Sequence, residues 1–115
     1  YALDGYDEIS LTGATKVIRN KREFIINPSD FGIHSLKAEE ISGGSNIPSS
    51  ARIFTEVLNG QGSEAQNNVV CANAAMAIAT TTNCDPKEGF EKAKESLLSG
   101  KANEAFKKLQ KLSSR

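Results

Sequence analysis

The sequence predicts an α/β fold, with a few strands near the amino end packed against several helices. Two short runs rich in β-branched residues, 15–19 and 22–27, have the composition of strands. From residue 49 onward, apolar residues recur at helical spacing between capping signals. With 115 residues, 38% of them apolar and 24% charged, the chain has the length and composition of one globular domain with a modest core.

Charge and hydropathy give no support for nucleic acid or a membrane as a partner, or for secretion. Fourteen basic residues balance 14 acidic ones, so the net charge of zero gives no reason to expect nucleic acid or an anionic membrane as a partner. No run approaches the roughly 20 apolar residues of a membrane span, and the first residues do not resemble a signal peptide. We therefore expect a cytoplasmic protein. Because the chain begins with Tyr1 rather than methionine, we also expect that it is preceded by a further segment.

A hairpin is predicted at the amino end of the chain. Asn20 and Lys21 separate the two strand-like runs and suit a tight turn between them. Residues 27–30 then read as a turn, and residues 31–41 as a short extended piece followed by a helical turn through 37–40.

A short helix is predicted after a glycine-containing loop at 42–46. It starts at residues 49–50, and Gly60 is well placed to end it in a left-handed conformation. Its apolar positions are Ile53, Val57 and Leu58.

The second predicted helix runs from Ser63 to about Thr82. Ser63 and Gln66 have capping-box spacing, in which each side chain bonds to the backbone amide of the other residue. Many alanines leave little side chain on any face, so we expect this helix to approach its neighbours closely and to be the buried one. Its apolar positions include Val69, Val70, Ala74, Ala75 and Ile78.

Two further helices are predicted before the end of the chain. Asp85, Pro86 and Glu88 give the first a cap, a proline at its first position and an acidic first turn, and Gly100 ends it. Its inner stripe is Phe90, Ala93, Leu97 and Leu98; the last helix carries Ala102, Ala105, Phe106, Leu109 and Leu112. Lysines 107, 108 and 111 favour the negative end of the helix dipole, and a basic nucleic-acid helix is the less favoured interpretation.

The stretch DGYDEIS, residues 4–10, is the first candidate site. Asp4, Asp7 and Glu8 crowd a short glycine loop. Adjacent carboxylates repel, so such a loop either stays solvated or holds a cation. Mg²⁺ binds through one or two protein carboxylates together with waters and substrate phosphates, which is chemistry that an Asp-Glu pair supplies. The alternative is a solvated turn.

Weaker candidates lie in loops and in the alanine-rich helix. Residues 42–46 and 59–63 contain glycines next to helices and could cradle a phosphate, although neither matches a known phosphate-binding fingerprint; turns and helix ends are the favoured interpretation. Asn73 stands at the centre of a helix expected to be buried, so its amide is either a structural tie to a neighbouring loop, the favoured interpretation, or part of a site. Cys71 and Cys84 lack metal-ligand spacing and are expected to be reduced thiols, and His34 has no telling neighbour and reads as a surface or packing residue.

An ordered set of motifs resembles one enzyme family along nearly the whole chain. They are DGYDEIS, Pro28-Ser29-Asp30-Phe31-Gly32, Ser42-Gly43-Gly44, Val57-Leu58-Asn59-Gly60, Asn73-Ala74-Ala75 and Leu98-Ser99-Gly100-Lys101-Ala102. In this order they resemble the carboxy-terminal third of anthranilate phosphoribosyltransferase. The resemblance implies that residues 1–115 are the carboxy-terminal portion of a large phosphoribosyltransferase domain. That domain is a mixed sheet flanked by helices, related to nucleoside phosphorylases. The amino-terminal helical domain and the first part of the α/β domain would lie outside the chain.

The resemblance also implies a reaction and a metal. The family transfers phosphoribose from phosphoribosyl pyrophosphate (PRPP) to anthranilate in tryptophan biosynthesis and releases pyrophosphate, with Mg²⁺. Asp7 and Glu8 match the acidic pair that holds magnesium on the pyrophosphate; neither is then a general acid or base, and the amine of anthranilate is the nucleophile. The family implies a homodimeric parent enzyme with contacts mainly in the helical domain, and we expect the isolated chain to be a monomer without transferase activity.

The sequence departs from the family at two places, and two rival functions stay open. Tyr1-Ala2 stand where the family usually has His-Gly, and Asn67-Asn68 where it often has Arg-Asp, so no role is carried over to these neighbours. One rival is phosphorolysis of a pyrimidine nucleoside, which is disfavoured because phosphate as co-substrate needs no acidic magnesium clamp. The other is a non-catalytic binding or assembly module.

Overall fold

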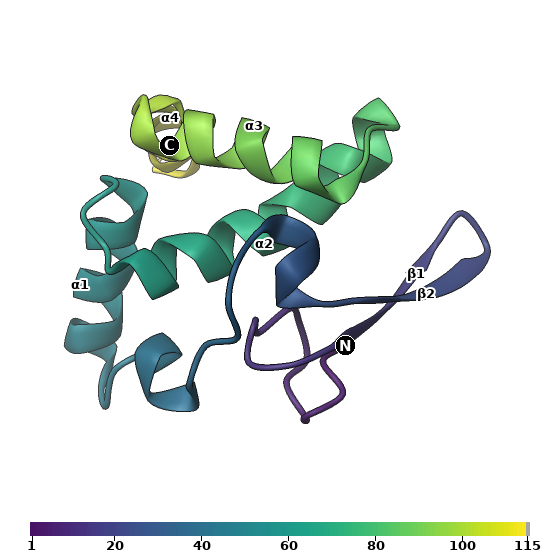
Figure 1. Ribbon diagram of the computed structural model, residues 1–115. Coiled ribbons are helices and arrows are strands. Elements are labelled where there is room, and N and C mark those ends of the chain that lie inside the picture. Colours follow the sequence, from purple (N-terminus) through teal and green to yellow (C-terminus); the bar gives the residue numbers. More distant parts are fainter. Residues whose placement is uncertain (115) are drawn as a thin grey trace.

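The computed structural model describes residues 1–114 (Figure 1). A hairpin and the loops around it lie on one side of a long central helix, and further helices cover its other side and its amino-terminal end. In chain order the elements are β1 (Thr15–Arg19), β2 (Arg22–Ile26), the 3₁₀ helices η1 (Pro28–Phe31) and η2 (Ala38–Ile41), α1 (Ile47–Leu58), α2 (Glu64–Thr82), α3 (Pro86–Leu98) and α4 (Lys101–Ser113).

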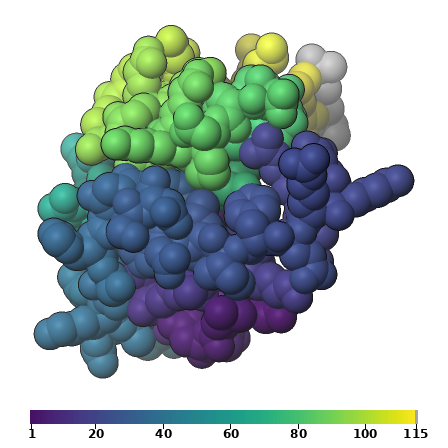
Figure 2. Space-filling view, turned by 45° about the vertical axis from the view of Figure 1, so that its right-hand side comes forward, coloured from purple at the N-terminus to yellow at the C-terminus, as the bar shows by residue number. Residues whose placement is uncertain are grey.

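The predicted hairpin is confirmed. Strands β1 and β2 pair antiparallel in a register that sets Thr15 opposite Ile26 and Arg19 opposite Arg22. Asn20 and Lys21 have φ angles of 51° and 62°, the left-handed pair that a two-residue turn requires. The tip of the hairpin, dark blue, extends beyond the body of the molecule (Figure 2).

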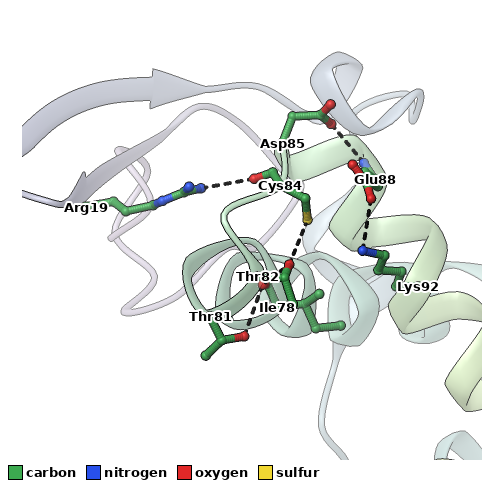
Figure 3. A network of polar contacts seen from close by, with 8 residues as sticks. All are labelled: Arg19, Ile78, Thr81, Thr82, Cys84, Asp85, Glu88 and Lys92. Carbon is green, nitrogen blue, oxygen red and sulfur yellow. Dashed lines mark hydrogen bonds and ion pairs between the residues drawn. The ribbon is translucent and has the colours of Figure 1, made fainter.

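One arginine of the hairpin contacts the turn between α2 and α3. The guanidinium of Arg19 donates to the carbonyl oxygen of Cys84 at 3.4 Å and to Oδ1 of Asn83 at 3.3 Å. Figure 3 shows this side chain reaching the turn, beside the Asp85 cap at the start of α3. The hairpin is thereby held to the far end of the central helix.

The predicted turn at residues 27–30 forms most of the 3₁₀ helix η1. Oδ2 of Asp30 accepts a hydrogen bond from the amide of Asn27 at 2.6 Å. Phe31 at the end of η1 is buried against Phe90 of α3, with ring centroids 5.6 Å apart. The helical turn predicted through residues 37–40 is confirmed as η2.

Helix α1 begins two residues earlier than predicted. Oδ1 of Asn46 accepts the amide of Ser49 at 2.9 Å, so Asn46 is the cap and Pro48 lies in the first turn. The end of the helix is as predicted, because Gly60 has a φ of 72° just beyond it.

Helix α2 is the centre of the molecule, and its capping box is confirmed. The Ser63 hydroxyl accepts from the amide of Gln66 at 3.1 Å, while Oε1 of Gln66 accepts from the amide of Ser63 at 3.0 Å. The helix buries more residues than any other in the described chain: Ala65, Cys71, Ala72, Ala75 and Ala79. Burial does not extend round the helix, because Val70 is 47% exposed.

Helix α3 packs directly on α2. A Cβ added to Gly89 would lie 2.5 Å from the carbonyl oxygen of Ala75, so the two backbones approach closely where α3 has no side chain. The predicted stripe is confirmed for Phe90, Ala93 and Leu97, which are buried. It is wrong for Leu98, which is 59% exposed because it lies about 100° round the helix from Leu97.

Helix α4 follows the predicted sequence range but buries none of its residues. Its one aromatic contact joins Phe106 to Phe54 of α1, with ring centroids 5.0 Å apart, and Leu109 and Leu112 are exposed. None of the helices within residues 1–114 combines the length and apolar character that crossing a bilayer would require.

Candidate functional site

The acidic stretch begins as a tight turn at the edge of β1. The amide of Ala2 donates to the carbonyl oxygen of Tyr6 at 2.9 Å, and Gly5 adopts a φ of 107°, a conformation that L side chains rarely reach. Ala2 is buried and forms a β-bridge with Thr15. The glycine in DGYDEIS therefore serves a turn that is pinned to the hairpin.

The three carboxylates of the stretch have different roles. Asp4 accepts a hydrogen bond from the hydroxyl of Thr12, so it closes the loop on itself. Asp7 and Glu8 are exposed, and the ion pairs found within residues 1–114 include neither of them. Asp7 and Glu8 are therefore the two carboxylates of the stretch that no hydrogen bond or ion pair described in residues 1–114 engages.

Asn73 of α2 fixes the chain immediately after this pair. Its Oδ1 accepts from the amide of Ile9 at 3.0 Å, and its Nδ2 donates to the carbonyl oxygen of Ile9 at 2.8 Å. Nδ2 also donates to the carbonyl oxygen of Val69 in its own helix, at 2.9 Å. Asn73 thus pairs with Ile9 as an adjacent strand would, and the side chain of Ile9 is buried in the core.

Asp7 and Glu8 are among the residues that line an open hollow of about 500 Å³. Ile9 and three residues of α2, Val69, the exposed Val70 and Asn73, line it as well, together with Ile41 from η2. No lysine, arginine or histidine is among the lining residues described in this part of the chain. The hollow is therefore acidic and apolar, and it offers no cationic group to a phosphate.

Such a donor set fits a hard cation that is shared with another ligand. Two adjacent carboxylates are what Mg²⁺ commonly takes from a protein, and the rest of its coordination shell comes from water and phosphate oxygens. Residues 1–114 contain no group of three or more acidic, histidine or cysteine side chains that could enclose a metal by themselves. The residues present fit a magnesium ion held against a phosphorylated ligand.

The glycine segments at 42–46 and 59–63 serve helix ends. Asn46 caps α1, and the hydroxyl of Ser50 donates to the carbonyl oxygen of Gly43 at 2.7 Å. Asn59 and Gly60 end α1, while Ser63 caps α2. The interpretation of these segments as turns and helix ends agrees with the structure.

The cysteines and the histidine lie away from the hollow. Cys71 is buried on α2 and its burial raises the pKa of its thiol; Cys84 is partly exposed, and both are free. His34 is exposed. None of them lines the hollow beside Asp7 and Glu8.

The sequence singles out Asp7, Glu8 and Asn73 as candidates, but it does not predict the link between the amide of Asn73 and the acidic pair. Asn73 and Ile9 are 64 residues apart, and neither residue type indicates the other. The available signal was the polar amide in an alanine-rich helix, which predicted a tie without naming its partner. The structure assigns that partner to the residue after Glu8.

Comparisons with known proteins show a matching family and several similar sequences. Residues 2–103 match the family model described as glycosyl transferase family, a/b domain. The chain is 64% identical over 113 residues to anthranilate phosphoribosyltransferase of Flavobacterium johnsoniae, a match that covers 98% of this chain and 34% of the relative. It is 65% identical to the enzyme of the same name from Christiangramia forsetii, with the same coverage of both chains.

Solved structures agree with these sequence relatives. Anthranilate phosphoribosyltransferase from Saccharomyces cerevisiae matches with a TM-score of 0.80 and 28% identity, over 93% of this chain and 32% of the yeast chain. The yeast enzyme in complex with PRPP and Mg matches with a TM-score of 0.78 and 31% identity, over 93% of this chain and 31% of that one. The chain spans about a third of the length of the relatives it matches. The α/β fold class and the resemblance found in the sequence are both confirmed.

Proposed function

Because the chain belongs to the glycosyl transferase family whose a/b domain it matches over residues 2–103, we propose that it is the carboxy-terminal portion of an anthranilate phosphoribosyltransferase. The whole enzyme would transfer phosphoribose from PRPP to anthranilate, for tryptophan biosynthesis in the cytoplasm, and release pyrophosphate. The observation that carries the proposal is the exposed Asp7-Glu8 pair, which lines an open hollow in a chain 64% identical to an enzyme of that name.

The acidic pair would act on the leaving group. As the bond between C1 of the ribose and the pyrophosphate loosens, negative charge grows on the pyrophosphate oxygens, and a bound Mg²⁺ stabilises that charge. Asp7 and Glu8 would hold and orient the ion from the protein side. Neither residue would move a proton, because the amine of anthranilate is itself the nucleophile.

The chain would supply only part of this site. Two carboxylates leave most of the coordination shell of Mg²⁺ to water and phosphate oxygens, and the hollow offers no cationic group to the phosphates. We therefore propose that the residues that bind anthranilate and cradle the phosphates belong to other parts of the enzyme. The chain on its own would be monomeric and inactive, with weak affinity for Mg²⁺, and the whole enzyme would be a homodimer. Formation of phosphoribosyl anthranilate by the purified 115-residue chain would contradict this.

A graft tests the assignment directly. The chain replaces the matching third of the Flavobacterium johnsoniae enzyme, to which it is 64% identical, and product formation from anthranilate and PRPP is measured with Mg²⁺. We expect an active graft. Asp7→Asn combined with Glu8→Gln should then lower kcat/KM by about two orders of magnitude or more, because charge stabilisation in the transition state is lost.

A matched control removes two carboxylates elsewhere. Glu91→Gln with Glu95→Gln changes the same number of charges on the exposed face of α3 and should leave kcat/KM within about twofold. If the control lowers kcat/KM as much as the Asp7/Glu8 variant does, the effect depends on the net charge of the protein and not on these two carboxylates.

An assay of the whole enzyme with anthranilate against thymidine or uridine distinguishes the rival functions. A pyrimidine nucleoside phosphorylase would release base from thymidine or uridine with phosphate, and it would do so without dependence on Asp7 and Glu8. A non-catalytic module would leave turnover unchanged when both carboxylates are replaced.

A further inference from the structure

We propose that Asn73 is a positioning residue for the acidic pair, acting through the backbone of Ile9; this inference rests on the proposed function. All hydrogen-bonding groups of its amide are used, with one bond accepted and two donated. Two of these bonds hold the amide and the carbonyl oxygen of the same residue, Ile9. An amide that pairs with both groups of one peptide segment fixes its orientation as well as its place.

The position of Ile9 makes this tie relevant to the metal ligands. The amide of Ile9 belongs to the peptide unit whose carbonyl comes from Glu8, so the bond from that amide to Asn73 fixes the plane directly after the acidic pair. On the other side, the turn over residues 2–6 is closed by the bond from Ala2 to Tyr6. Asp7 and Glu8 therefore lie between two anchored points, although their own side chains are exposed.

The anchor is rigid because Asn73 itself is fixed. Its third bond returns to Val69 one helical turn earlier, and the neighbouring Ala72 is fully buried in the core. A ligand pair presented on a solvated loop would have to be ordered when the ion and PRPP bind. A pair presented on this anchored segment has much of that ordering completed beforehand, which favours binding.

A second asparagine on the same helix provides a control away from the acidic stretch. Nδ2 of Asn67 donates to the carbonyl oxygen of Gly62 at 3.3 Å, so it too ties α2 to a loop and is partly buried. That loop joins α1 to α2 and is not the acidic stretch. Asn73→Ala removes three hydrogen bonds and Asn67→Ala one, so the loss of stability should be larger for Asn73. A positioning role also separates the two variants in their Kd for PRPP, which a merely structural role would leave unchanged in both.

The experiment uses the Flavobacterium johnsoniae graft with each substitution. Calorimetry measures the Kd for PRPP at saturating Mg²⁺, and hydrogen exchange measures protection of the Ile9 amide. For Asn73→Ala we expect a Kd roughly 10- to 100-fold higher, as for other groups that orient metal ligands, and faster exchange at Ile9. Asn67→Ala should change neither. Urea unfolding identifies any variant that fails to fold; for that case Asn73→Leu keeps the bulk of the side chain and removes the same three hydrogen bonds.

The outcomes separate the two proposals. An unsubstituted graft that neither binds PRPP nor makes product overturns the proposed function, and this inference with it. If the unsubstituted graft binds PRPP while Asn73→Ala and Asn73→Leu leave the Kd within twofold, this inference alone is overturned. Equal increases in Kd for the Asn67 and Asn73 variants also overturn it.

Discussion

Helices α3 and α4 are consecutive, are each 13 residues long and are both amphipathic, yet only α3 has its apolar face covered. Phe90, Ala93 and Leu97 of α3 are buried against α2 and η1. Leu109 of α4 is 61% exposed. Helix α4 touches its neighbours through Phe106, the part-buried Ala102 and Asn103, whose Nδ2 donates to Oδ1 of Asn59 at 2.7 Å. The spacing of apolar residues predicts that a helix has an inner face, but it does not say what covers that face.

The acidic stretch shows the same difference, because the sequence does not reveal which of its carboxylates has a partner within the chain. Asp4 is satisfied inside the chain by Thr12, whereas Asp7 and Glu8 have no ionic partner among residues 1–114. The apolar face of α4 and the carboxylates of Asp7 and Glu8 are therefore exposed to solvent, while α2 and α3 bury their apolar faces against each other. Unfolding and labelling of the 115-residue chain can measure that contrast.

The largest expected effect comes from the core side of the comparison. Phe90→Ala leaves a cavity beside Phe31 and should lower the free energy of unfolding by about 3–5 kcal/mol. Leu109→Ala on α4 should change it by no more than about 0.5 kcal/mol, because that side chain is mostly exposed. Urea unfolding followed by circular dichroism measures both. Similar losses would show that the face of α4 is covered in solution.

A smaller loss is expected where α3 crosses α2. Gly89→Ala places a methyl group 2.5 Å from the carbonyl oxygen of Ala75, and the helices must separate to accept it. We expect a loss of about 1–3 kcal/mol. Gly43→Ala is the control, since an added methyl group there meets nothing within 4 Å, and it should be near neutral. A neutral Gly89→Ala would mean that the crossing is looser than the structure indicates.

The caps of the two helices also differ. Oδ1 of Asp85 accepts the amide of Glu88 at 2.8 Å, whereas α4 starts at Gly100 without a side-chain cap. Asp85→Ala should cost about 1 kcal/mol in the same unfolding measurement, and Asp85→Asn only a few tenths, because asparagine also caps helices well. Equal costs for the two variants would assign the effect to the charge of Asp85 and not to its hydrogen bond.

The smallest expected effect is a difference in the rates at which the two cysteines are labelled. Burial on α2 raises the pKa of the Cys71 thiol, so at pH 8 it should stay protonated and react slowly with iodoacetamide, while the partly exposed Cys84 reacts first. Since the folded pKa lies above the unfolded one, the stability associated with this thiol is present below the unfolded pKa and declines as the pH rises above it. Mass spectrometry of the labelled peptides measures the order, and urea should abolish the difference. Faster labelling of Cys71 in the native chain would contradict its burial.

Local signals in the sequence determined much of the fold. Asn20-Lys21 predicted the hairpin turn, Ser63 with Gln66 the start of α2, and Asp85-Pro86 the start of α3, and the structure confirms all three. Each of these rests on hydrogen bonds or backbone angles within a few residues. The start of α1 was misplaced because Asn46, which lies in a glycine-containing loop, is the residue that caps it.

What only the tertiary structure decided depends on contacts between distant parts of the chain. No sequence pattern indicated that Val70 and Leu98 would be exposed or that Gly89 would face Ala75, because the neighbouring helix determines which side of each helix is covered. The candidate site shows the same division. The carboxylates of Asp7 and Glu8 were evident from composition and order, but their placement depends on a bond between Ile9 and Asn73, 64 residues apart, and no local pattern encodes such a contact.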